Sequence, residues 1–129
     1  MNKVKKFFVA LLALGTIVSS FGNITSVQAA TVYPGYIGAF NFNNYRSGKS
    51  AIVNTSISAP RGDTAVRTTS TIEVNATGAY IGTVSNTSGY GENYAGGTFT
   101  NNTGKTLASF GAHSVIGGVN YIQYTVTTF

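Results

Sequence analysis

Polar and apolar positions alternate one by one between residues 65 and 75, where the chain reads Ala-Val-Arg-Thr-Thr-Ser-Thr-Ile-Glu-Val-Asn. A period of two residues is typical of a strand with one buried face, and the many β-branched residues favour the same structure. The pattern predicts a strand around which the rest of the fold is built, with Arg67 and Glu73 facing water. The face expected in the core consists of Val66, Thr68, Ser70, Ile72 and Val74.

Further short segments with strand character are separated by residues that favour turns. The segments are 36–42, 51–57, 79–85, 95–100, 105–114 and 119–128. Together with the central segment they predict an all-β fold, a small antiparallel β-sandwich or a partly open barrel of seven to eight short strands. The last segment is apolar or aromatic on both faces, which predicts a central position for it in a sheet.

Three tetrapeptides of the form Asn-x-Ser/Thr-Gly lie between predicted strands, at residues 75–78, 86–89 and 101–104. An asparagine side chain mimics a backbone turn, and glycine adopts positive φ without steric cost, so each tetrapeptide predicts a hairpin turn. The same residues match the acceptor site for N-glycosylation, which is the alternative interpretation. Pro34-Gly35 and Gly117-Gly118 are further predicted turns.

Aromatic residues are concentrated between residues 31 and 45. We expect Phe40 and Phe42 in the core, on the same strand face as Tyr36 and Gly38, because aromatic side chains dominate packing in small domains. The alternative is an aromatic platform for sugar rings or for a membrane surface.

Two short motifs have functional counterparts in other proteins. Arg61-Gly62-Asp63 matches the triplet of integrin-binding loops, but its residue types after Pro60 also predict an ordinary turn. Gly48-Lys49-Ser50 lacks the first glycine of a phosphate-binding loop, so we expect a turn there and no nucleotide site.

The N-terminal residues predict secretion. Lys3, Lys5 and Lys6 precede an apolar run, and Val27-Gln28-Ala29 provides the small residues that signal peptidase recognises. The run is interrupted and shorter than the roughly 20 residues of a membrane-spanning helix. We therefore expect a helical signal peptide at residues 1–29, cleaved after Ala29, and one secreted β domain at residues 30–129 without a transmembrane anchor.

Charge and composition restrict the partners of this domain. Residues 30–129 carry five basic and three acidic side chains, a net charge of +2, which is too small for binding nucleic acid through its phosphates. The chain has no cysteine, so stability must come from packing and strand pairing. Exposed sheet edges leave self-association possible.

Catalytic and metal-binding chemistry is sparse. His113 is the one histidine in the sequence, and we expect a structural role for it near the end of a strand. A catalytic triad would require the fold to bring a serine and a carboxylate to it. A zinc site needs several Cys or His ligands, and calcium needs a cluster of oxygen ligands. We therefore expect no catalytic residue, cofactor or metal.

The segment 88–97 is the best candidate for a binding site. Tyr90 and Tyr94 provide amphipathic contact surface among several glycines, and Glu92 and Asn93 are suited to fixing a ligand hydroxyl or amine. The alternative is a mobile hairpin connection without a ligand.

The chain resembles the non-lantibiotic lactococcin-type bacteriocins, which are small, cysteine-free, secreted β-sandwich proteins. The resemblance rests on Tyr45, Gly48, residues 50–54 (Ser-Ala-Ile-Val-Asn), Arg61-Gly62-Asp63-Thr64 and Arg67, within a span of about a quarter of residues 30–129. It implies interference with envelope synthesis in competing bacteria, without catalysis. The chain differs from that family in its greater length, its lack of tryptophan and its final residues, Tyr124 to Phe129, which leaves the target open.

Two functions follow as hypotheses. The first is a secreted, non-enzymatic β domain that binds or coats an extracellular or cell-envelope target, such as a cell-wall or polysaccharide component or another protein. The second is a secreted antibacterial protein that acts on the cell envelope.

Overall fold

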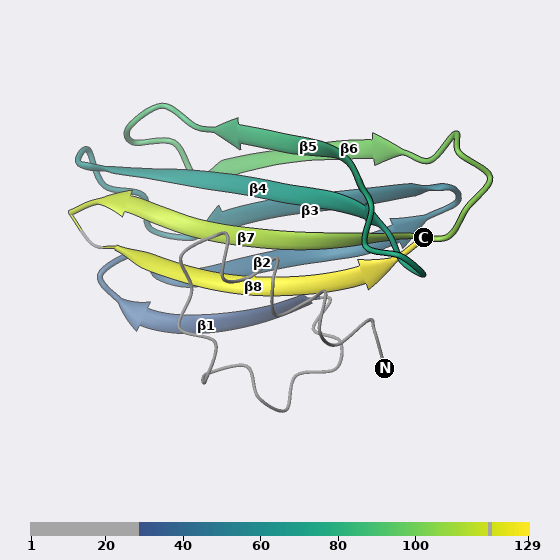
Figure 1. Cartoon of the computed structure of the whole chain (residues 1–129). Helices are drawn as coiled ribbons and strands as arrows, with labels where there is room; N and C mark the ends of the chain where they lie inside the picture. The colour runs from purple at the N-terminus through teal and green to yellow at the C-terminus, as the bar shows by residue number, and fades with distance from the viewer. Residues whose placement is uncertain (1–28, 119) are drawn as a thin grey trace.

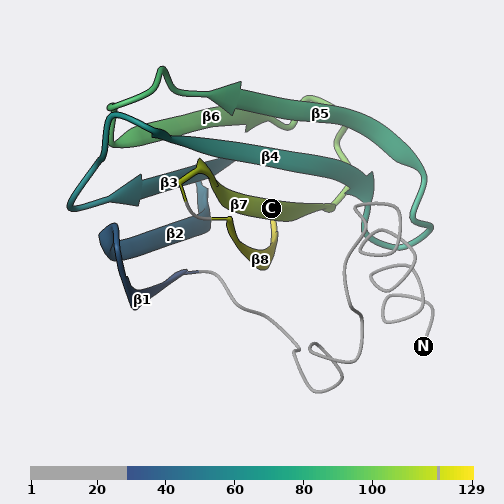
Figure 2. The same ribbon diagram turned by 90° about the vertical axis from the view of Figure 1, so that its left-hand side faces the viewer.

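The computed structural model describes residues 29–118 and 120–129, and these residues form a two-layer β-sandwich (Figures 1 and 2). The predicted signal peptide lies outside the described residues, except for Ala29, where the first strand begins. The strands are β1 (Ala29–Gly35), β2 (Gly38–Ser47), β3 (Ser50–Ile57), β4 (Thr64–Val74), β5 (Tyr80–Thr87), β6 (Tyr94–Thr100), β7 (Leu107–Gly117) and β8 (Tyr121–Thr128). The prediction of an antiparallel all-β sandwich is confirmed.

Each layer is a four-stranded antiparallel sheet. One sheet has the order β1-β2-β3-β6 and the other has the order β5-β4-β7-β8. In Figure 1 the second sheet lies in front of the first, with β4 in front of β3 and β8 in front of β2. The connections β1–β2, β3–β4, β5–β6 and β7–β8 therefore meet at one end of the sandwich, which we call the loop end.

Strand β4 has the position and the buried face that its alternation predicts. It is an inner strand, paired with β5 on one side and with β7 on the other. Val66, Thr68, Ser70, Ile72 and Val74 are all buried, whereas Arg67 is exposed and Glu73 is partly exposed. Because the alternation extends over the whole strand, a single register satisfies every position.

Two of the predicted hairpin turns are wrong. The tetrapeptide at 75–78 does join two neighbours, β4 and β5, but residues 88–93 and 101–106 cross from one sheet to the other. Asn101 still forms a side-chain turn, because its Oδ1 accepts a hydrogen bond from the Thr103 backbone N–H at 3.0 Å. Local sequence therefore reverses the chain without deciding which sheet receives the next strand.

Both ends of the domain also differ from expectation. Strand β1 is the additional eighth strand, and its turn lies at Tyr36-Ile37 instead of Pro34-Gly35, so Tyr36 leaves the strand. The last strand is not central, because β8 forms the edge of its sheet beside β7. Its outward Tyr124 and Val126 are nevertheless buried, opposite Ala112 and Phe110 of β7. Buried side chains therefore occur on both faces of β8, although it is an edge strand.

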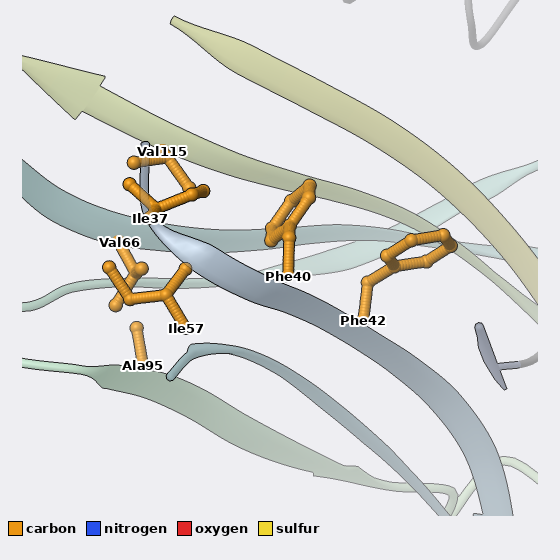
Figure 3. Packing of buried hydrophobic residues seen from close by; sticks show 7 residues of the cluster. All are labelled: Ile37, Phe40, Phe42, Ile57, Val66, Ala95 and Val115. Atoms are coloured by element: carbon orange, nitrogen blue, oxygen red, sulfur yellow. The ribbon is translucent and has the colours of Figure 1, made fainter. Parts of the chain in front are cut away.

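The hydrophobic core lies between the sheets in two clusters. Figure 3 shows the first, in which Phe40 and Phe42 of β2 lie among side chains from both sheets, with ring centroids 5.5 Å apart. Its other members are Ile37, Ile57, Val66, Ala95 and Val115. The second lies toward the opposite end and consists of Ala51, Ile72, Val74, Leu107 and Phe129. The predicted core positions of Phe40 and Phe42 are confirmed.

Candidate functional site

The predicted site residues separate into two surfaces. Tyr90 lies in the β5–β6 connection at the loop end, where it is 66% exposed and close to Gly117. Glu92 stabilises its own loop, because its Oε2 accepts a hydrogen bond from the Gly89 backbone N–H at 2.8 Å. The Asn93 carbonyl accepts one from Ile57 N–H at 3.0 Å. Glu92 and Asn93 therefore contribute to the loop's own geometry.

Tyr94 belongs to the outer face of the β1-β2-β3-β6 sheet. It begins β6 and is 55% exposed. A Cβ atom at Gly96 would meet the Tyr94 hydroxyl, and it would lie 2.9 Å from the Tyr94 Cζ and from the Asn54 Cβ. Tyr94 thus lies along the sheet in the space that Gly96 leaves empty, beside Asn54. Because Gly96 has no side chain, the Tyr94 ring can lie against the surface of the sheet.

Next to Tyr94, amide and hydroxyl side chains form hydrogen-bonded rows across this outer face. Thr31 Oγ1 donates to Asn41 Oδ1 at 2.7 Å, and Asn41 Nδ2 donates to Ser56 Oγ at 3.3 Å. Ser56 pairs with Tyr94 in the register of β3 and β6. In the next row Asn43 Nδ2 donates to Asn54 Oδ1 at 2.7 Å. The bonds hold the amide groups in fixed orientations across neighbouring strands.

We call this surface the amide face. Strand alternation assigns to it Thr31, Tyr33, Asn41, Asn43, Tyr45, Ile52, Asn54, Ser56, Tyr94, Gly96 and Thr98. None of these residues is charged. Tyr33 is 78% exposed and Tyr45 is 41% exposed, so three tyrosines surround the amide groups. Such a surface combines aromatic area with oriented donors and acceptors that match neutral hydroxyl groups.

The Arg61-Gly62-Asp63 triplet is a turn at the loop end, and its side chains are held by Tyr36. The Tyr36 hydroxyl lies 3.2 Å from both Asp63 carboxylate oxygens. The Arg61 guanidinium stacks 4.9 Å from the Tyr36 ring centroid, and its Nε donates to the Tyr36 carbonyl at 3.0 Å. These contacts join the β1–β2 and β3–β4 turns, which agrees with the interpretation as a turn.

His113 lies in the core and is fully buried between the sheets. Its Nδ1 is 3.0 Å from Thr55 Oγ1 of the opposite sheet, and its Nε2 is 2.7 Å from Thr125 Oγ1 of β8. A neutral imidazole has one donor and one acceptor nitrogen, so it satisfies both hydroxyls. Burial lowers the pKa of His113 from 6.5 to about 4, and the Asn54 backbone partly opposes this shift. At neutral pH the side chain is an uncharged structural group.

Metal ligands do not gather in the part of the chain that the structure describes. Within residues 29–118 and 120–129, no group of three or more His, Cys, Asp or Glu side chains is arranged to hold a metal ion. In the same residues no helix has the length and apolar character needed to cross a membrane.

Comparisons of the chain with known protein families, curated proteins and solved structures give no match. The resemblance to lactococcin-type bacteriocins therefore stays a prediction. Its residues map to the β2–β3 hairpin, the turn before β4 and the start of β4. Functional conclusions for this protein must come from its own surfaces.

The sequence contains a signal for the amide face in the alternation of residues 40 to 45. Residues 41, 43 and 45 alternate with the core residues Phe40, Phe42 and Asn44, so their common outward face follows from period two. Their pairing with Asn54 and Ser56 depends on the sheet register, and the position of Tyr94 depends on a connection between sheets. The common face of residues 41, 43 and 45 could be predicted from the sequence, whereas their neighbours on β3 and β6 depend on the fold.

Proposed function

We propose that this protein is a secreted, non-enzymatic binding domain whose amide face attaches it to a neutral polysaccharide outside the cell. The observation that carries the proposal is the ladder of oriented amides between exposed tyrosines on a face without charged side chains. Because a neutral sugar offers hydroxyl groups and apolar ring faces, it can use both features of this surface.

Three physical points support this assignment over a charged or purely apolar ligand. The side-chain amides of Asn43 and Asn54 are already ordered by their mutual hydrogen bond, so binding costs little side-chain entropy. An uncharged face gains nothing from Coulomb attraction to an anion. Tyr45 and Tyr94 lie two rows apart across the sheet, which suits a chain of several sugar units better than a single monosaccharide.

Retention on insoluble neutral glycans tests the proposal. A panel containing a β-glucan and a polymer of N-acetylglucosamine should retain the wild-type protein, and the Tyr45→Ala/Tyr94→Ala variant should bind about tenfold more weakly, a loss of about 1.4 kcal/mol. Gly96→Val should weaken binding in the same direction, because its side chain displaces Tyr94 without removing it.

Tyr80→Ala is the control, since Tyr80 is also an exposed tyrosine but lies on β5 of the other sheet. If Tyr80→Ala weakens glycan binding as much as the double variant does, the assignment to the amide face is contradicted. If the wild-type protein binds no neutral glycan, the proposed function itself is contradicted. Inhibition of the growth of related bacteria by the purified protein, without retention on glycan, would instead support the bacteriocin hypothesis.

A further inference from the structure

The end of the sandwich opposite the loop end contains a pocket with basic walls. Its volume is about 400 Å³, within the range of small-ligand sites. Three cationic side chains line it, Arg46, Lys49 and Lys105, and they come from the β2–β3 hairpin and the β6–β7 connection. The remaining lining residues are Asn101, Gly104, Thr106, Thr128 and Phe129.

The fold directs these side chains to the same place. Arg46 continues the inward series of Phe40, Phe42 and Asn44 along β2, so it lies over the open end of the space between the sheets. Its Nε donates to the Gly48 carbonyl at 2.8 Å, which holds the guanidinium beside the turn. The floor includes Phe129, whose ring packs edge-on against Phe99.

Three hydrogen bonds stabilise the walls of the pocket. The Asn101 backbone N–H donates to the Lys49 carbonyl at 2.8 Å, and Lys49 Nζ donates to Asn102 Oδ1 at 3.2 Å. Asn101 Nδ2 donates to the Lys105 carbonyl at 2.7 Å. The β6–β7 connection is therefore anchored to the β2–β3 turn, and the pocket is partly preorganised.

Charge is distributed unevenly between the two ends. Three of the five basic residues in 30–129 line this pocket, and no acidic side chain does. Asp63 and Glu92 lie at the loop end. Glu73 lies near the other end of β4, but on its outer face opposite Ala108 and outside the lining of the pocket. Even if a carboxylate of residue 129 is counted, the cations remain in excess. The side chains that line the pocket therefore carry a local excess of positive charge.

We infer that this pocket binds a phosphate group carried by an extracellular polymer or by a lipid headgroup. Phosphate oxygens match the planar donors of an arginine and the point charges of lysines. Thr106 and Thr128, which also line the pocket, carry hydroxyl groups that can donate to such oxygens. The site is separate from the amide face, so it would give the domain a second, charge-dependent attachment to an envelope that bears phosphate.

Titration of the full-length protein tests this site directly. Glycerol 3-phosphate, followed by two-dimensional amide NMR, should shift the signals of Lys49 and residues 101–106 and leave the signals of the amide face unchanged. The Lys49→Gln/Lys105→Gln variant should bind about tenfold more weakly. Raising the ionic strength should weaken binding to the wild-type protein, because exposed charges are screened.

Arg67→Gln is the control, since it removes one exposed cation on the outer face of β4, outside the pocket. The Arg67→Gln variant should bind glycerol 3-phosphate with the same affinity as the wild type. Retention on poly(glycerol phosphate) but not on phosphatidylglycerol vesicles would identify a polymer as the source of the phosphate, and the reverse would identify a lipid. An absence of binding, or equal weakening by Arg67→Gln, would overturn the inference. Because glycan retention uses other residues, either outcome leaves the amide-face experiment interpretable.

Discussion

Buried polar side chains give this small core its specificity at the scale of single residues. Asn44 of β2 donates from Nδ2 to the Ser109 carbonyl of β7 at 2.9 Å and accepts from the Ser109 hydroxyl, also at 2.9 Å. Thr68 of β4 donates to the Ala95 carbonyl of β6 at 2.9 Å. Each bond joins the two sheets, so sliding one sheet past the other would leave buried groups without partners.

The buried histidine predicts how stability responds to acid. The pKa of His113 is about 4 in the folded protein and 6.5 for the unperturbed group. The unfolded chain therefore binds more protons between these values, and stability is fully present above pH 6.5 and falls as the pH decreases toward 4. The expected loss from this residue is about 3 kcal/mol.

Urea unfolding at several pH values measures this dependence, and His113→Gln is the comparison. Glutamine keeps a donor and an acceptor, but its shape differs from that of the buried imidazole, so the variant should be less stable at neutral pH. Because glutamine does not titrate, the free energy of unfolding of the variant should decrease less between pH 6.5 and 4. If the stability of the wild type and that of His113→Gln decrease equally with pH, His113 is not responsible for the loss of stability in acid.

At the scale of elements, the sequence predicts strands and their faces better than their partners. The alternation in β4 correctly separates core residues such as Val66 and Ile72 from outward ones such as Arg67. It contains no information on which strands become neighbours, because pairing depends on contacts distant in the sequence. For that reason the sequence does not predict the edge position of β8. It also does not predict that Tyr90 and Tyr94 lie on two different surfaces.

Strand β1 covers the edge of β2, which predicts the effect of its removal. β1 pairs with β2 from Ala29↔Asn43 to Val32↔Phe40, and Val32 packs on the core cluster around Phe40. A chain that starts at residue 36 should expose the backbone of β2, which invites pairing with another copy. Size-exclusion chromatography should detect oligomers that a chain starting at residue 30 does not form.

Thermal unfolding of the same two chains supplies the second readout, and the shorter chain should unfold at a lower temperature because it loses the packing of Val32. If the shorter chain remains monomeric and equally stable, β1 contributes neither edge protection nor core packing.

At the scale of the whole molecule, the sandwich separates its surfaces by position. The amide face occupies one broad side, the loop end holds the Tyr36, Arg61 and Asp63 cluster, and the basic pocket lies at the far end, roughly 30 Å away for an eleven-residue strand such as β4. The side chains of the amide face and those that line the pocket are different. The protein is thus suited to attach to two chemical features of one surface.

The connections between the sheets predict a single unfolding transition. β6 belongs to one sheet, but it lies in the sequence between β5 and β7 of the other, so neither sheet can lose its order alone. Far-UV circular dichroism and tyrosine fluorescence should therefore give coincident urea transitions, as expected of a two-state domain. Two separated midpoints would mean that the sheets unfold independently.

The same threading of β6 bears on when the protein becomes folded during its synthesis. When only β1 to β5 have been synthesised, the β1-β2-β3-β6 sheet still lacks β6, and the β5-β4-β7-β8 sheet still lacks β7 and β8. Stable packing has to wait for the last strand, which ends at Thr128. A polypeptide that stays loose until its final residues emerge remains able to pass through a narrow translocation channel, as the export predicted from its first residues would demand.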